Sequence, residues 1–222
     1  MLKELIKTKE WIIDILMPKK CLGCGREGLY ICKDCEIFLS EVNMMEAEML
    51  DLRNPTYIMS AWEYEGLVEK LILKIKYDGC YDIINDLIEK AFGKIELNLP
   101  KNTYITFVPM WGRKERRRGF NQAELIAKKV GEITGRPVAK LLEKIKDNRS
   151  QVGLDPQERA ENVKGVFGLR KQVLLREVRP YSILIVDDVY TTGATMTECA
   201  RVLKRAGVKQ VWGFTLARKL SI

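Results

Sequence analysis

Apolar positions after residue 55 follow two periods, which predict a series of strands and helices. Apolar runs typical of strands cover residues 57–64, 103–110, 182–186 and 210–217. Apolar positions with helical spacing cover residues 67–75, 83–92, 121–134 and 195–206. Strands that alternate with helices predict an α/β fold, in which a mostly parallel, doubly wound sheet carries helices on both faces.

The N-terminal part of the chain has a different pattern. Residues 1–17 alternate Lys and Glu with large apolar residues, which predicts an amphipathic helix. Residues 36–52 are rich in Glu and Met and predict a second helix, and four cysteines lie between the two. We therefore predict an N-terminal region over 1–54 and a larger α/β domain over 55–222.

Composition and charge narrow the class of protein. The chain has 222 residues, of which 46% are hydrophobic and 31% charged, as in soluble globular proteins. Its net charge of +8 suits an anionic partner, either a polyphosphate metabolite or nucleic acid, but also a basic surface without a dedicated partner. No apolar run is long enough for a membrane span, and residues 1–17 lack a signal-peptide cleavage site, so we expect a cytoplasmic protein.

The chain contains no histidine. This absence excludes histidine as a general acid or base, serine–histidine triads and histidine-containing metal sites. Any chemistry must therefore use carboxylates, cations, backbone amides and a metal ion.

Residues 183–195, with the sequence ILIVDDVYTTGAT, combine a buried strand with a polar loop and the start of a helix. Asp187 and Asp188 fall at the carboxyl end of the strand, where α/β sheets bind ligands. The loop that follows offers hydroxyls, Gly193 and the free N–H groups of a helix start, which favour an anion. Carboxylates for a diol and donors for a phosphate match ribose 5-phosphate. The alternative is a turn that only caps a helix.

A basic loop is predicted between the strand at 103–110 and the helix at 121–134. Five of the six residues at 113–118 are cationic. In isolation such a run is a solvated surface, but at the carboxyl end of a strand in the same sheet it could hold a diphosphate leaving group. We prefer Arg116 and Arg118 as its donors, ahead of Arg113 and Lys114.

Two CxxC pairs, Cys21–Cys24 and Cys32–Cys35, lie seven residues apart. Two such pairs can bring four thiolates to one tetrahedral Zn²⁺, and four protein ligands leave no open position, which indicates a structural ion. A redox dithiol is the main alternative, although it needs only one pair. The two remaining cysteines have no partner at ligand spacing and are expected to be ordinary buried or half-buried residues.

The sequence also resembles a known family. Residues 183–195 resemble the signature with which type I phosphoribosyltransferases bind 5-phosphoribosyl 1-diphosphate (PRPP). The segments RRRGFNQAELIA, SQVGL…ERAENVKGVF and KYDG resemble ComF-type phosphoribosyltransferase proteins, which are linked to natural transformation and carry an N-terminal four-cysteine finger. The resemblance covers nearly the whole chain. It departs at Trp111-Gly112, where the family usually has a His-Pro-like pair.

The resemblance implies a type I phosphoribosyltransferase fold and roles for individual residues. Asp187 and Asp188 would bind the ribose hydroxyls and the shell of a Mg²⁺ ion, and 191–195 the 5-phosphate. Asp187, Asp188, Arg116 and Arg118 are the predicted catalytic residues. The residues predicted to bind PRPP are Asp187, Asp188, Val189, Tyr190, Thr191, Thr192, Gly193, Ala194 and Thr195. Residues 148–167 would form either a flexible loop that closes over PRPP or an ordinary surface hairpin.

Two functions are compatible with these residues. The first is a ComF-type protein that binds PRPP with Mg²⁺ and acts in DNA uptake, with single-stranded DNA and the uptake machinery as partners. Trp11, Tyr30, Trp62 and Trp111 are candidates for stacking on bases, or else packed in the core or in loops. The alternative is an active phosphoribosyltransferase of nucleobase or related metabolism without a DNA role. The acceptor, turnover and oligomeric state are not encoded in a recognisable motif.

Overall fold

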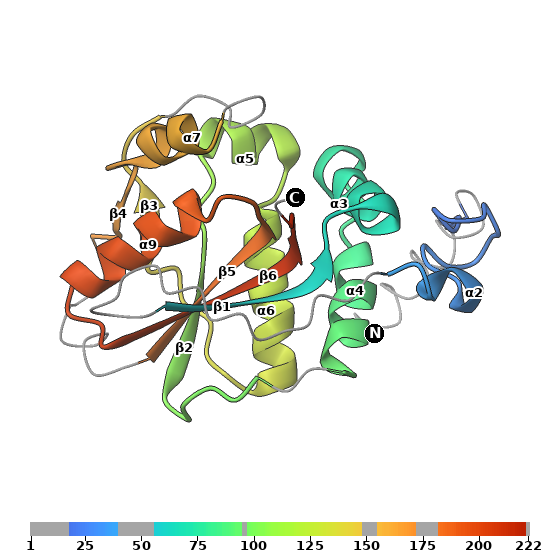
Figure 1. Cartoon of the computed structure of the whole chain (residues 1–222), viewed down its shortest axis with the longest axis horizontal. Coiled ribbons are helices and arrows are strands. Elements are labelled where there is room, and N and C mark those ends of the chain that lie inside the picture. Colours follow the sequence, from blue (N-terminus) through green and yellow to red (C-terminus); the bar gives the residue numbers. More distant parts are fainter. Residues whose placement is uncertain (1–17, 40–55, 95–96, 148–154, 172–181, 221–222) are drawn as a thin grey trace, which may run out of the picture.

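A four-stranded parallel sheet forms the centre of the molecule. The computed structural model describes residues 18–39, 56–94, 97–147, 155–171 and 182–220 (Figure 1). The strands of the sheet, in the order in which they lie side by side, are β1 (Thr56–Glu63), β6 (Gln210–Arg218), β5 (Ser182–Tyr190) and β2 (Thr103–Phe107). A separate antiparallel pair joins β3 (Leu142–Lys144) to β4 (Phe167–Leu169).

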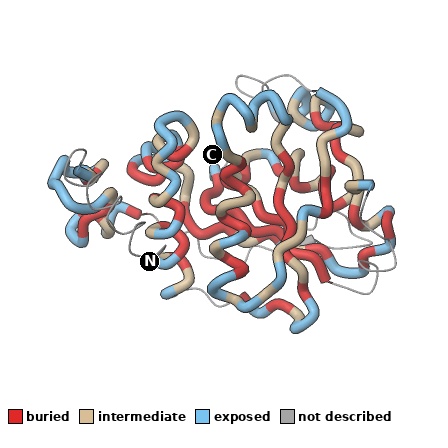
Figure 2. Tube along the Cα trace, turned by 180° about the vertical axis from the view of Figure 1, so that it is seen from behind, coloured by how far each residue is buried: buried red, intermediate tan, exposed pale blue. Residues whose placement is uncertain are grey.

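Helices cover both faces of the sheet, as predicted for a doubly wound fold (Figure 1). One face packs on α3 (Gly66–Asp78), α4 (Ile83–Phe92) and α6 (Gln122–Thr134). The other face packs on α9 (Ala194–Arg205) and on the β3–β4 pair. Successive residues of β5 alternate between the two cores, because neighbouring side chains of a strand point to opposite faces. Burial is concentrated in these central strands (Figure 2).

Most predicted elements are present, and two differ in an informative way. The strand predicted to end at Val186 continues to Tyr190, since Val189 and Tyr190 still pair with β6. The basic segment predicted as a loop is instead a helix, α5 (Gly112–Arg118). Arg, Lys and Glu are good helix formers, and Gly119, at φ 86°, ends the helix in the left-handed conformation.

The segment predicted as a closing loop or a hairpin contains regular structure. A short helix, α7 (Pro156–Val163), begins at Asp155, whose side chain accepts from the Glu158 N–H at 2.8 Å. The Glu158 carboxylate accepts from the Asp155 N–H in return, which completes a capping box. The first part of the predicted segment, 148–154, lies outside the described residues.

The N-terminal predictions are covered only in part. The predicted helix at 1–17 and most of the one at 36–52 lie outside the described residues, as does the predicted boundary at 54–55. Within the described part, the short helix α2 (Lys33–Glu36) ends where the second helix was expected to begin. None of the described helices is long and apolar enough to cross a membrane.

Candidate functional site

The two adjacent carboxylates of β5 lie on opposite faces of the sheet. Residues two apart on a strand point to the same face. Val186 and Asp188 therefore face α3 and α6, whereas Ile185 and Asp187 face α9. The pleat of the strand thus separates two charges that are neighbours in sequence, and each carboxylate meets different partners.

Asp188 is held by side chains from two helices. Gln122 of α6 donates from Nε2 to Asp188 Oδ2 at 2.6 Å, and the Lys76 Nζ of α3 lies 3.0 Å from the same oxygen. Arg118 of α5 in turn donates to Gln122 Oε1 at 2.6 Å. Burial alone would lower the pKa of Lys76, but the Asp188 carboxylate outweighs it and raises that pKa above its usual value. A ligand hydroxyl that binds Asp188 therefore uses Oδ1 or replaces one of these donors.

Asp187 has a contrasting environment. Among the described residues no side-chain cation forms an ion pair with it, and its Oδ1 accepts from the backbone N–H of Asp188 at 2.8 Å. Burial raises the pKa of Asp187 to about 7, and repulsion by the Asp188 carboxylate adds to the rise. A carboxylate with this pKa gains most from a ligand that brings a cation or a hydroxyl donor.

The loop after β5 forms one wall of a cavity of about 360 Å³. Gly193, at φ 74°, is the N-cap of α9, and the first N–H groups of this helix, which have no partner within the helix, belong to residues at the cavity. The lining of this cavity contains both aspartates, most of the loop and cations from other elements. The lining residues are Tyr64, Lys76, Arg159, Asp187, Asp188, Val189, Tyr190, Thr191, Thr192, Gly193, Thr195, Met196, Thr215 and Lys219.

The α5 cations are distributed unevenly around this edge. Arg118 lines a second cavity of about 280 Å³ together with Lys76, Lys114 and Arg117. Lys114 also lines a third cavity of about 140 Å³, whose wall includes Asp187. Arg116 lines none of these three cavities, so its role as a donor stays a prediction, and Lys114 is the α5 cation that shares a cavity wall with Asp187.

Several residues at the site were not singled out from the sequence. Lys76 and Gln122 hold Asp188, and Arg159 of α7 and Lys219 beyond β6 line the 360 Å³ cavity. A signal existed for the first two, because Lys76 begins the KYDG segment and Gln122 ends RRRGFNQ. Nothing in the sequence pattern connects Lys219 to the site.

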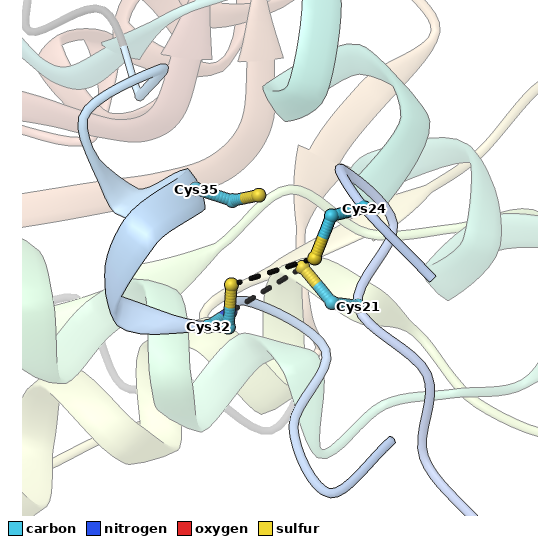
Figure 3. Close-up of side chains that lie close together, drawn as sticks. All are labelled: Cys21, Cys24, Cys32 and Cys35. Atoms are coloured by element: carbon cyan, nitrogen blue, oxygen red, sulfur yellow. Dashed lines mark hydrogen bonds between the residues drawn. The ribbon is translucent and has the colours of Figure 1, made fainter. Parts of the chain in front are cut away.

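The four predicted metal ligands come together in a knuckle over residues 18–39 (Figure 3). Their sulfur atoms lie within 4.8 Å of one another. Cys24 Sγ and Cys32 Sγ are 3.7 Å apart, and a tetrahedral site with a Zn–S distance of about 2.3 Å needs about 3.8 Å. The Cys32 N–H donates to Cys21 Sγ at 3.4 Å, as expected beside a thiolate. The donor set and its spacing therefore fit a tetrahedral metal ion.

The turn between the first two cysteines requires a glycine. A Cβ at Gly23 would lie 2.7 Å from Cys35 Sγ, so any larger residue would push one ligand away from the others. The knuckle lies at one end of the molecule, beyond α4 (Figure 1). It contacts α4 through an ion pair between Lys90 and Glu36, and Lys19 Nζ lies 2.8 Å from Asp82 Oδ2.

Comparison with known proteins identifies a domain family and several relatives. Residues 116–221 match the family described as phosphoribosyl transferase domain. Competence protein F of Haemophilus influenzae is 33% identical over 55% of this chain, and the alignment covers 53%, about half, of that relative's length. Competence protein ComFC of Bacillus subtilis is 28% identical over 89% of this chain and 77% of its own length. DNA utilization protein YhgH of Salmonella typhi is 26% identical over 90% of this chain and 89% of its own length.

Among solved structures, the allosteric regulatory enzyme of purine biosynthesis is similar at 18% sequence identity and a TM-score of 0.39. The match covers 61% of this chain and 25% of that enzyme. This likeness is too remote to support a conclusion about this chain.

Proposed function

Because this chain belongs to the ComFC-like family of phosphoribosyltransferase-type proteins, we propose that it binds PRPP with Mg²⁺ and acts in the handling of DNA taken up by the cell. The fold is the one expected for that family, a parallel sheet between helices with a four-cysteine knuckle at its N-terminal side. The role in DNA uptake is supported by the names of the relatives, two of which are competence proteins and one a DNA utilization protein.

The observation that carries the PRPP proposal is the polarity of the 360 Å³ cavity. Both carboxylates of β5 line this cavity, and so do residues of the loop 191–195 at the start of α9. A helix of this length attracts an anion at its N-terminus, and the adjacent Thr hydroxyls add donors. Arg159 and Lys219 supply further positive charge on the same cavity. A ribose with its diol at the aspartates and its phosphate at the loop suits this arrangement.

The residues present also fit a Mg²⁺ ion that arrives with PRPP. Asp187 would hold it, because carboxylate oxygens are the ligands that Mg²⁺ prefers and this side chain has no competing cation among the described residues. The ion would supply charge neutralisation at the diphosphate. Asp188 would bind a ribose hydroxyl, in a position fixed by Gln122 and Lys76.

The knuckle is proposed to hold a structural Zn²⁺ ion at Cys21, Cys24, Cys32 and Cys35. Four thiolates leave no position for a substrate, so the ion would stabilise the knuckle and take no part in chemistry. Its function would be to order a segment that has few buried residues of its own.

Thermal shift with PRPP and Mg²⁺ tests the first part of the proposal. The wild-type protein should be stabilised by the pair together, and Asp187→Asn should lose at least about tenfold in affinity, because one charged hydrogen bond or metal contact is removed. Asp34→Asn, on the exposed surface of the knuckle, is the matched control and should respond as the wild type does. No stabilisation of the wild type by PRPP would contradict the proposal.

Active transfer of the phosphoribosyl group is the second candidate function. The cluster of Lys114, Arg118 and Lys76 beside the aspartates favours it, because a leaving diphosphate needs several cations. The measurement is pyrophosphate release from PRPP and Mg²⁺ with a panel of nucleobases and amines. Release that Asp187→Asn abolishes would establish an enzyme, whereas binding without release would assign the site to ligand sensing.

A further inference from the structure

A second surface lies next to the phosphoribosyl pocket and includes three cations that phosphoribosyl transfer would also use, Lys76, Lys114 and Arg118. It is formed by the C-terminal end of α3, the turn that follows, α5 and the residue after its cap. We refer to it as the cation–aromatic surface, and it consists of Lys76, Tyr77, Tyr81, Lys114, Arg117, Arg118 and Phe120. Six of these residues, all except Tyr81, line the cavity of about 280 Å³ together with Gly79.

The cations of this surface are poorly neutralised. No residue of α5 is buried, and among the described residues no carboxylate forms an ion pair with any α5 cation. Burial lowers the pKa of Lys114, and repulsion by Arg118 and Lys76 lowers it further. Like charges held together in this way are stabilised by an anionic ligand.

The aromatic rings of the surface are displayed to solvent. Tyr77 is 70% exposed and Tyr81 is 58% exposed, so neither contributes its ring to the core. The guanidinium of Arg118 lies 5.8 Å from the Tyr77 ring centre, and Tyr81 meets Phe120 edge to face at 6.0 Å. These contacts orient the rings, and the exposure of both tyrosines leaves ring area accessible to a ligand.

We propose that the cation–aromatic surface binds single-stranded nucleic acid, with bases stacked on Tyr77 and Tyr81 and phosphates held by Lys114 and Arg117. Exposed rings beside unpaired cations are the combination by which proteins bind single strands without regard to sequence. A duplex would satisfy the cations but not the rings, because its bases are stacked inside. The inference rests on the proposed role in DNA handling and assigns that role to a particular place.

The aromatic residues of this surface differ from those that the sequence suggested for stacking on bases. Trp62 is 1% exposed and lies in the core, so it cannot stack on a base. Tyr30 belongs to the knuckle, where the Lys19 Nζ lies 5.6 Å from its ring centre. Lys76 alone lines both the 280 Å³ and the 360 Å³ cavities, so the strand and PRPP would meet at this residue.

Fluorescence anisotropy with a labelled oligothymidylate of about 15 nucleotides tests the inference on the full chain. Tyr77→Ala and Tyr81→Ala should each weaken binding about tenfold, the value expected for the loss of one stacked base. Tyr57→Ala is the matched control, since Tyr57 is exposed at the start of β1 and stacks on Trp212 away from this surface. It should bind the oligonucleotide as tightly as the wild type.

Salt dependence separates the charge contribution. Replacing Lys114 and Arg117 with Gln should reduce the slope of log K against log salt by about 1.4, because each phosphate contact to a single strand contributes about 0.7. Lys209→Gln, an exposed lysine before β6, is the control and should leave the slope unchanged.

The outcomes are distinct from those of the PRPP proposal. The Tyr81→Ala protein should keep the full thermal shift with PRPP and Mg²⁺, which also shows that it is folded, whereas Asp187→Asn should lose that shift and still bind the oligonucleotide. Equal affinity for duplex and single strand, or unchanged affinity in both tyrosine variants, would overturn the inference. An equal response to oligouridylate would support it and extend it to RNA.

Discussion

The knuckle and the carboxyl edge of the sheet hold their functional groups in opposite ways. In the knuckle, four ligands from one turn and the short helix α2 lie within 4.8 Å of one another, and thiolates at that distance repel unless an ion joins them. At the sheet edge, groups from β5, α3 and α6 meet through hydrogen bonds and an ion pair that need no ligand. The first geometry would be completed by the proposed metal ion, whereas the hydrogen bonds and the ion pair of the second are present without a ligand.

Because of this difference, we expect the two regions to respond to different perturbations. Metal binding is coupled to folding where the protein supplies little core of its own. A preorganised site, in contrast, changes its affinity when one supporting contact is lost. Among the described residues, two ion pairs join the knuckle to α4, and the buried residues of the knuckle belong to the core cluster on that face of the sheet. The knuckle is far from the two aspartates in sequence, so substitutions can perturb each region in turn.

The largest effect is expected on removal of the metal. Cys32→Ser should abolish tight zinc binding, and the knuckle should lose a stabilisation on the order of 10 kcal/mol. Hydrogen exchange should then become fast over residues 18–39 and stay slow in β5 and β6. Cys80→Ser, which replaces a cysteine outside the cluster, is the control. Fast exchange throughout the sheet would show that the two regions are not independent.

The next effect concerns the ion pair that fixes Asp188. Lys76→Met should lower the free energy of unfolding by about 3 kcal/mol, because it leaves a largely buried carboxylate without its cation. Urea denaturation measures the loss. The double variant Lys76→Met with Asp188→Asn removes the unpaired charge and should recover most of the lost stability. A double variant no more stable than Lys76→Met alone would contradict a preorganised pair.

A smaller effect is expected in the loop 191–195, which is proposed to bind the phosphate. Gly193→Ala should cost about 1–2 kcal/mol for the left-handed backbone, and its Cβ would come 2.3 Å from Tyr190 Oη, which must move. PRPP binding should weaken as the loop is displaced. Gly135→Ala carries the same backbone cost at φ 67° with open space around it, so it should lose stability without loss of PRPP binding, measured by thermal shift and calorimetry.

The smallest effect is a pH dependence of PRPP affinity. The pKa of Asp187 is raised to about 7, so the unliganded carboxyl binds a proton below that pH, while the proposed binding of PRPP with Mg²⁺ would use the carboxylate. Affinity should therefore be full above pH 7 and fall by up to about tenfold per unit below it. Calorimetry on the wild type and Asp187→Asn separates this titration from that of the ligand's own phosphate, since the variant should lack the steeper part.

Much of the fold could be predicted because it follows local rules. The helix at 83–92 has the predicted bounds, and the four strands of the parallel sheet were all expected. The basic helix α5 was missed because its charges have no apolar side, and periodicity cannot reveal a helix that buries nothing. The end of β5 was missed because its last residues are held by pairing with β6, a partner distant in sequence.

The candidate sites likewise contain a part that local sequence predicts and a part that depends on contacts distant in sequence. The spacing of the four cysteines predicts their cluster, because the four ligands lie close together in the sequence. The support of Asp188 by Lys76 and Gln122 depends on how α3 and α6 pack on the sheet, which no spacing encodes. Lys76 and Gln122 lie in the segments that resemble the family, but the resemblance does not indicate which residues they contact.

The opposite orientation of Asp187 and Asp188 has a consequence for how this strand tolerates change. Substitutions among the apolar residues of β5 alter only volume on one face. A deletion or insertion of one residue at 183–186 would instead invert every later side chain. Asp187 would then meet Lys76 and Gln122, and Asp188 would turn toward α9. The length of this strand is therefore expected to be far less mutable than its composition, and a single-codon deletion there to be as damaging as the loss of both acids.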